Sequence, residues 1–154
     1  MKERRVGIVG NERAKFTVHT AEAARCLIAK LLDGATAVVS GHCHLGGVDI
    51  WAEQTGRAMK LGLIIHRPAE LNWQRGFKPR NIAIARDSTE VHVIVVAKYP
   101  RTYTDRKFEE CYHCKRKDHV KSGGCWTGIR ALKLARPVTW HIIAPNGAVT
   151  SKEG

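Results

Sequence analysis

The sequence lacks a long apolar run. No stretch approaches the roughly 18 apolar residues that a membrane-spanning helix needs. The N-terminal segment MKERRVGIVG starts with basic residues, but its apolar run ends at Gly10 and Asn11, and no small-residue cleavage site follows. These absences argue against a membrane protein or an exported protein, and they predict a cytoplasmic location.

Acidic residues are scarce. The chain of 154 residues has 14 Asp and Glu against 26 Lys and Arg, which gives a formal net charge of +12. Such a surface favours polyanionic partners, namely nucleic acid, nucleotides or anionic lipid, although a basic protein without any such partner has the same composition. Hydrophobic residues make up 44%, which argues against global disorder, and the length predicts a single domain over residues 1–154.

The five cysteines occur without an export signal, which argues against a disulfide framework. Three of them cluster in the pattern Cys111-x2-Cys114-x4-His119-x5-Cys125, which is one residue longer than a zinc knuckle. Three thiolates and an imidazole suit tetrahedral Zn²⁺, so we expect a structural zinc site with these four ligands. His113 is an alternative histidine ligand, and a set of free, reduced thiols on a loop stays open.

Apolar runs alternate with segments of helical spacing along the chain. The expected strands cover residues 5–10, 35–40, 61–68, 91–97 and 137–143. The expected helices cover residues 20–33, 48–60, 79–88 and 127–135, the first of them capped by Thr20. This order predicts an α/β fold, a Rossmann-like three-layer sandwich with a mainly parallel sheet of about five strands. We expect residues 98–125 to form an inserted basic Cys/His loop, called the insert below, and the tail from Pro145 to fray.

Glycines follow the expected strands and precede the expected helices. They are Gly10, Gly41, Gly46, Gly47, Gly123 and Gly124. Ligands of parallel sheets bind at the carboxyl ends of the strands, where such glycines let a phosphate approach the backbone. The helix that starts near Val48 would then offer free N–H groups to an anion. Ordinary tight turns would explain one or two of these glycines.

Four motifs resemble the SLOG superfamily, which includes DNA-processing protein A and the LOG-type phosphoribohydrolases. They are VGIVGNER, SGHCHLGGVDIWAE, PRNIAIARDSTEVHVIV and SGGCWTGIRALKLARPV, and the resemblance covers roughly residues 5–97 and 122–143. It implies a nucleotide site formed by the loops after the strands. The expected site residues are Gly10, Asn11, Arg13, Gly41, Gly46, Gly47, Asp49, Arg80, Asn81, Gly123, Gly124 and Thr127.

Four of these side chains have an expected role. Thr127 suits a hydroxyl donor to an anion at the start of the last helix. Arg80 suits a bidentate phosphate contact. Asp49 suits a ribose hydroxyl, or is simply an acidic residue at a helix N-terminus. Asn81 suits a base or ribose contact, or braces its own loop.

One departure from the LOG-type pattern bears on activity. These hydrolases have a glutamate three residues after the threonine of the last loop, and Arg130 occupies that position here. Half of the catalytic pair is therefore missing, which argues against phosphoribohydrolase activity, and the catalytic residues, if any, are unknown.

The insert supports a second interpretation. Residues 98–121 contain eight basic and four acidic residues, and three tyrosines and Phe108 are interleaved with them. This composition suits single-stranded nucleic acid, whose bases stack on aromatic rings, but a solvated loop has it too. The hypotheses are therefore a nucleotide-binding domain, a nucleic-acid-binding module that uses the zinc-stabilised insert, or a LOG-type hydrolase; a homo-oligomer stays open.

The short stretch His42-Cys43-His44 also contains metal-type residues. Because neighbouring loop residues rarely face the same way, we expect them to line the ligand cleft instead of binding metal. The remaining histidines (His19, His66, His92 and His141) are expected to be plain core or edge residues, and Cys26, on an amphipathic helix, is expected to be a core residue.

Overall fold

The computed structural model describes residues 2–154 and contains one six-stranded sheet in the order β3-β2-β1-β4-β5-β6. All strand pairs are parallel except β5 with β6. The strands are β1 (Arg5–Gly10), β2 (Ala37–Ser40), β3 (Gly62–Ile65), β4 (Glu90–Val96), β5 (Val138–Ile143) and β6 (Val149–Glu153). The expected α/β class with a mainly parallel sheet is confirmed.

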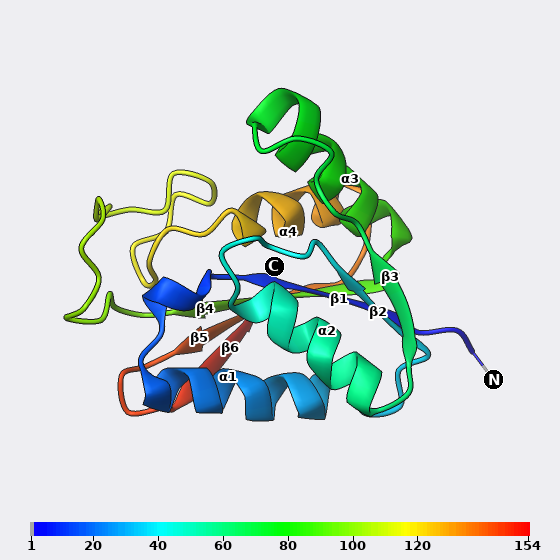
Figure 1. The fold of residues 1–154 in the computed structure, drawn as a ribbon, viewed down its shortest axis with the longest axis horizontal. Coiled ribbons are helices and arrows are strands. Elements are labelled where there is room, and N and C mark those ends of the chain that lie inside the picture. Colours follow the sequence, from blue (N-terminus) through cyan, green and yellow to red (C-terminus); the bar gives the residue numbers. More distant parts are fainter. Residues whose placement is uncertain (1) are drawn as a thin grey trace.

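Helices cover both faces of the sheet, which makes three layers (Figure 1). α1 (Val18–Leu31) and α2 (Val48–Ala58) lie on one face. α3 (Lys78–Asp87) and α4 (Gly124–Lys133) lie on the other. The β-branched strand residues are buried between these layers in two core clusters, one on each face. Within the described residues, no helix is both long and apolar enough to span a membrane.

The start of α1 differs from the expectation. The N-cap is Thr17, and Thr20 occupies the third helical position. The Thr17 hydroxyl accepts from the Thr20 N–H at 3.0 Å, and the Thr17 N–H donates to the Thr20 hydroxyl at 2.9 Å. This reciprocal pair satisfies two N–H groups that would otherwise be free, so the helix begins three residues earlier than the apolar spacing indicates.

The tail is not frayed, contrary to the expectation from the sequence. A turn with Gly147 at φ 86° leads into β6, which pairs with β5 over five residues in the antiparallel direction. All five residues of β6 are exposed. The segment VTSKE therefore has no apolar alternation from which a strand is recognised, and its backbone pairing with the sheet edge is what orders it.

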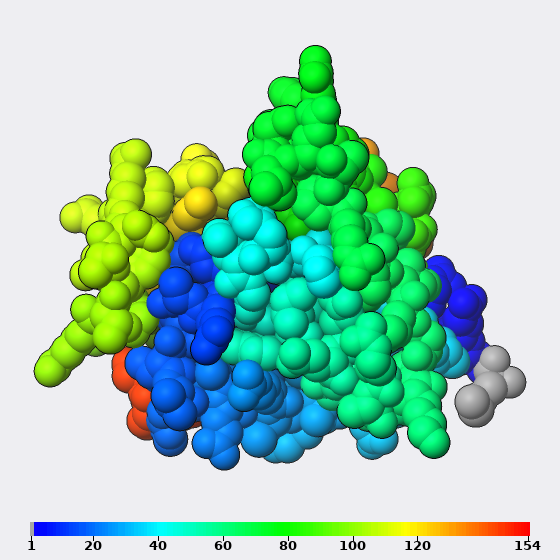
Figure 2. Space-filling model, viewed as in Figure 1, coloured from blue at the N-terminus to red at the C-terminus, as the bar shows by residue number. Residues whose placement is uncertain are grey.

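The loops that follow β1, β2 and β4 gather at the carboxyl edge of the sheet (Figure 1). They include the short helix η1 (Arg13–Lys15), the glycine-rich loop 41–47 and the insert. The π-helical turn η2 (Trp73–Phe77) directly precedes α3 in the chain, and it stands at the top of the molecule in Figure 1. Figure 2 shows the insert and the segment around η2 as two projections with a depression between them.

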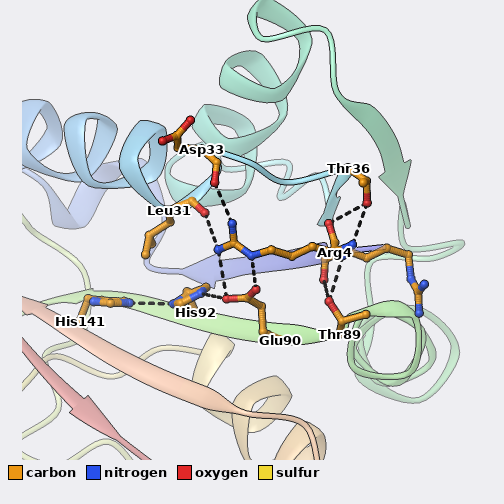
Figure 3. Close-up of polar contacts among 9 residues, drawn as sticks. Arg4, Leu31, Asp33, Thr36, Thr89, Glu90, His92 and His141 are labelled. Carbon is orange, nitrogen blue, oxygen red and sulfur yellow. Dashed lines mark hydrogen bonds and ion pairs between the residues drawn. The ribbon is translucent and has the colours of Figure 1, made fainter. Parts of the chain in front are cut away.

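A polar network crosses the sheet on the face covered by α1 (Figure 3). Arg4 donates to the carbonyls of Leu31 and Asp33 at the end of α1 and forms an ion pair with Glu90. Glu90 contacts His92 at 2.7 Å, and His92 Nδ1 lies 2.9 Å from His141 Nε2. The network ends on β6, because His141 Nδ1 lies 2.7 Å from the hydroxyl of Ser151.

Candidate functional site

The depression at the carboxyl edge is a cleft of about 430 Å³. Its floor comes from the end of β1, the first turns of α2 and α4, and the start of α3. The loop 41–47, η2 and the insert form its sides. This is the edge at which the sequence predicts the ligand.

Aromatic side chains line two sides of the cleft. Trp73 and Phe77 of η2, with His44 stacked on Phe77 at 6.2 Å, form one side. The insert supplies the other, and its lining rings are Tyr103, Phe108, Tyr112 and His113. Both sides present the faces or edges of rings to the cleft, which suits a planar aromatic ligand.

Eight of the twelve predicted nucleotide-site residues line this cleft. They are Gly10, Asn11, Asp49, Arg80, Asn81, Gly123, Gly124 and Thr127. The other four, Arg13, Gly41, Gly46 and Gly47, do not. A Cβ on Gly47, which has φ 87°, would lie 2.5 Å from the backbone of Asn11 and Arg13, so this glycine serves the close packing of two loops.

The N-terminus of α2 offers less to an anion than the sequence suggests. The Val48 N–H donates to the Asn11 carbonyl at 3.2 Å, and Asp49 lies buried in the first turn. The Asn11 side chain is also engaged, because it accepts from the Val96 N–H at 2.9 Å and donates to the Lys121 carbonyl at 3.1 Å. Asn11 therefore ties the insert to β1 and β4.

Arg80 reaches the cleft from the first turn of α3. Its Nε donates to Asn81 Oδ1 at 2.9 Å, its Nη1 donates to the Gly41 carbonyl at 3.0 Å, and its guanidinium lies 5.3 Å from the Phe77 ring centre. These contacts fix the guanidinium plane beside the cleft. Asn81 thus braces the Arg80 side chain, a contact that differs from both roles expected for it.

Asp49 is the buried acid of the cleft. Burial raises the pKa of its carboxyl from 3.8 to about 6, although the nearby charge of Arg80 and the N–H of Cys43, which donates to Asp49 Oδ2 at 3.2 Å, oppose that shift. Two further cations, Lys15 and Lys121, line the cleft with it. The cleft therefore contains three cations, Lys15, Arg80 and Lys121, against two acids, Asp49 and Glu12, and Glu12 pairs with Lys15 at 3.3 Å.

The hydroxyl of Thr127 is the unsatisfied group of the cleft. Thr127 is 1% exposed and lies in the first turn of α4, and its Oγ1 has no hydrogen-bond partner among residues 2–154. Buried hydroxyls are nearly always paired in folded proteins, so this one is free to pair with a water molecule or a ligand in the cleft.

The predicted metal ligands come together next to the cleft. One ligand atom each from Cys111, Cys114, His119 and Cys125 lies within 4.8 Å of all the others. His119 Nε2 lies 3.4 Å from Cys114 Sγ and 3.3 Å from Cys125 Sγ. A tetrahedral zinc site needs a nitrogen–sulfur separation of about 3.5 Å, so these two separations match such a site, and the four residues could hold a metal ion.

The surroundings prepare the cluster for a cation. Hydrogen bonding with Cys125 lowers the pKa values of Cys111 and Cys114, the latter to about 7, whereas the same contacts raise the pKa of Cys125. The thiolate is the form that binds metal. His119 Nδ1 lies 2.8 Å from Asp118 Oδ1, and Asp118 in turn accepts from Lys152 of β6 at 3.0 Å. A carboxylate behind a ligating histidine orients its ring toward a metal.

The residues of the stretch His42-Cys43-His44 have different neighbours. His42 Nδ1 contacts Glu53 Oε2 at 2.7 Å, whereas Cys43 and His44 line the cleft. Within the described part of the chain, the only group of metal-type residues close enough to share an ion is the Cys111 cluster. His113 lines the cleft and is not part of that cluster.

Several cleft residues were not among the predicted site residues. Lys15, Trp73 and Phe77 come from η1 and η2, two short elements for which the sequence has no periodicity. Lys15 is 7% exposed, and its ammonium donates to the Lys121 carbonyl at 3.0 Å. The interleaved aromatic residues were a sequence signal for the cleft, but they were interpreted as a nucleic-acid surface.

Comparisons with known proteins support the fold. No protein-family model matches the sequence, and no curated protein matches it significantly. Among solved structures, the fold is similar to the molybdenum cofactor carrier protein MCP from Chlamydomonas reinhardtii, with a TM-score of 0.56 and 12% identity, covering 89% of this chain and 75% of that one. At this identity the likeness shows an α/β fold alone, and the resemblance to the SLOG superfamily stays a prediction.

Proposed function

We propose that this protein binds a phosphorylated nucleotide or nucleotide derivative in the cleft at the carboxyl edge of the sheet. The observation that carries the proposal is the unpaired, buried hydroxyl of Thr127, which lies in a cleft that also contains Arg80 and two aromatic sides. A ligand with a ring and an anionic group would satisfy all three features at once.

Each part of the ligand has a matching group. Arg80, held by Asn81 and the Gly41 carbonyl, would bind the phosphate, and Thr127 would donate its hydroxyl to the same group. The base would stack between the insert and η2. Asp49 would accept from a ribose hydroxyl while ionised.

We further propose that the cluster of Cys111, Cys114, His119 and Cys125 binds Zn²⁺. Thiolates and imidazole are the ligands that zinc prefers, and four such ligands form a closed structural site. Cys125 lies in the first turn of α4, so the metal would attach the insert to that helix. The ion would then stabilise the chain beside the cleft without taking part in chemistry.

A thermal-shift screen tests the ligand class. The screen includes AMP, GMP, ADP-ribose and inorganic phosphate, together with molybdenum cofactor because the structural neighbour is described as its carrier. A ligand that binds the native state raises the midpoint of unfolding, by an amount that grows with the logarithm of its concentration relative to its Kd. A rise with nucleotides and none with the unphosphorylated nucleosides supports the proposal, and no rise with any of the compounds contradicts it.

Arg80→Ala tests the phosphate contact. Loss of a charge-assisted contact should weaken nucleotide binding about 30- to 100-fold, as measured by calorimetry. Arg86→Ala is the matched control, because Arg86 lies on the same helix with 63% of its side chain exposed. Unchanged affinity in Arg80→Ala would show that the phosphate binds elsewhere.

Two alternatives make different predictions. A LOG-type hydrolase would release free base from a nucleoside monophosphate. Arg130 of α4 is not among the residues that line the cleft, and we expect no release.

A nucleic-acid-binding module would use the insert, in which Lys121 lies over the rings of Phe108 and Tyr112 at 5.4 and 5.1 Å. Oligonucleotide affinity should then fall steeply between 50 and 200 mM salt, in contrast to that of a small nucleotide.

A further inference from the structure

We propose that metal binding at the Cys111 cluster controls the affinity of the cleft for its ligand. The metal would fold the same loop that forms one aromatic side of the cleft, so that the cleft is complete only in the metal-bound protein. This inference rests on the proposed function and adds a regulatory role to a site that would otherwise be purely structural.

Metal ligands and cleft residues alternate along the insert. Tyr112 and His113 stand between Cys111 and Cys114, and both line the cleft. Lys121 to Gly124 follow His119 and precede Cys125, and they line the cleft as well. Because a coordinated ion would fix the backbone on both sides of each of these stretches, it would also fix the position of the cleft side chains between the ligands.

Apolar burial in the insert is small. Outside the cysteine cluster, the side chains of Asn11 and Lys15 bind the Lys121 carbonyl, and Lys152 binds Asp118. Between residues 98 and 121 only Pro100, Cys111, His119 and Val120 are buried, and two of these four are metal ligands. The backbone within the ligand loop pairs at one isolated bridge, Cys111 with Arg116. Ordering a residue costs on the order of 1–2 kcal/mol of conformational entropy, which such a small apolar contribution does not offset over so long a segment.

The remainder of the cleft does not depend on the metal. Arg80, Asn81 and Asp49 lie on α3 and α2, which pack on the central strands through the two core clusters. The Phe108 and Tyr112 rings, in contrast, pack on each other at 5.5 Å and on Lys121, all within the insert. Loss of the ion should therefore remove the stacking side of the cleft while the phosphate contact stays in place.

Coupling between metal affinity and ligand affinity is reciprocal by thermodynamic necessity. If the metal raises the affinity for the ligand by some factor, the ligand must raise the affinity for the metal by the same factor. The metal-free protein would retain weak binding through Arg80 and Thr127. The metal-bound protein would add the stacking contacts.

The experiment measures binding of AMP and ADP-ribose by calorimetry to three forms of the full chain. These are the zinc-loaded protein, the same protein after removal of zinc by a chelator, and the Cys114→Ser variant. Cys26→Ser is the control, because Cys26 is an exposed cysteine of α1 remote from the cluster. We expect at least a tenfold loss of affinity in the stripped protein and in Cys114→Ser, recovery of the stripped protein on adding zinc, and no change in Cys26→Ser.

A reciprocal measurement needs no variant. Competition with a chromophoric chelator gives the zinc affinity of the wild-type protein with and without saturating AMP or ADP-ribose, and we expect the nucleotide to raise it at least tenfold. Equal nucleotide affinity with and without zinc would overturn the coupling and leave the nucleotide site intact. Failure of the zinc-loaded protein to bind either nucleotide would overturn the proposed function as well as the inference.

Discussion

The sheet network and the cleft are both polar regions with buried members, but they differ in how far their groups are satisfied. In the network from Arg4 through Glu90, His92 and His141 to Ser151, every member contacts the next. In the cleft, the Thr127 hydroxyl has no partner within residues 2–154, and the Asp49 carboxyl is buried with a raised pKa. The network is paired within the folded chain, whereas the cleft retains a buried hydroxyl without a partner among residues 2–154.

Whether a buried polar group has hydrogen-bond partners is therefore a better guide to its role than its residue type. His92 and His141 are titratable residues in a buried position, which by itself suggests a site. Their ring nitrogens, however, are used by one another and by Glu90 and Ser151, so they join β4 to β5 and β6. A fully paired buried network fixes a fold, whereas unpaired groups at a cleft are available to a ligand.

The largest expected effect concerns the metal. Cys114→Ser should lose the bound ion, from about one per chain to none, because the cluster is left with three ligands. Metal analysis of the purified protein measures this, and anomalous scattering at the zinc edge locates the ion. Cys43→Ser, a cleft variant outside the cluster, should retain the ion, and an ion located beside His42 and Cys43 would contradict the ligand assignment.

The same variant also tests the contrast between the two regions. Hydrogen exchange should lose protection in residues 98–125 and keep it in β4 and β5, because the network does not include the insert. Equal loss in both would show that the two regions fold as one unit.

Acid should act mainly on the sheet network. Burial lowers the pKa of His141 from 6.5 to about 4 and also lowers that of His92. A histidine with a lowered pKa in the folded state contributes its full stability above pH 6.5, and this contribution is lost as the pH falls. Glu90 also makes the protein less stable in acid. Burial raises the pKa of its carboxyl, but hydrogen bonds from Arg4 and His92 outweigh burial and lower that pKa. We expect the free energy of unfolding to fall by about 3 kcal/mol between pH 7 and pH 4 from His141.

Denaturant titrations at several pH values measure this loss. His141→Asn should be less stable at pH 7 and show a smaller decrease toward pH 4. His19→Asn, at an exposed histidine on α1, should keep the wild-type slope. An unchanged slope in His141→Asn would assign the acid sensitivity to another group.

Asp49 should respond to pH in the opposite direction. Its folded-state pKa is raised from 3.8 to about 6, so its contribution to stability is present below pH 3.8 and is lost as the pH rises through 6. Asp49→Asn removes this cost and should stabilise the protein by about 2 kcal/mol at pH 7.5, with little effect at pH 4. Thermal unfolding at the two pH values checks the sign, and nucleotide affinity should fall in the same variant if the carboxylate contacts the ligand.

The sequence was sufficient for the features that depend on local pattern. The apolar run of β4 and the helical spacing of α2 predicted their elements, and the Cys/His spacing predicted a cluster that the structure brings together. It was insufficient where order comes from long-range pairing. β6 has no apolar alternation and is held by β5, and η2 forms part of the cleft without any periodicity.

The candidate site shows the same division. The glycine-rich motifs indicated the correct edge of the sheet, because carboxyl ends of parallel strands lie together. They did not show that Gly47 and Asn11 are used to pack the loops on one another. Nor did they show that rings of the insert line the cleft, since that depends on a return of the chain over many residues.

The smallest expected effect is the most direct test of the contrast between the two regions. Thr127→Val replaces the unpaired hydroxyl with a methyl group of similar volume, so it removes a group that is buried without a partner. We expect the free protein to gain about 1 kcal/mol of stability and its affinity for the nucleotide to fall several-fold. Ser151→Ala, which removes a hydroxyl that His141 uses, should instead lose stability and leave nucleotide binding unchanged. Opposite signs in the change of the free energy of unfolding of the two variants would distinguish a hydroxyl available to a ligand from one that stabilises the fold. A loss of stability in Thr127→Val would instead mean that the Thr127 hydroxyl already has a partner in the free protein.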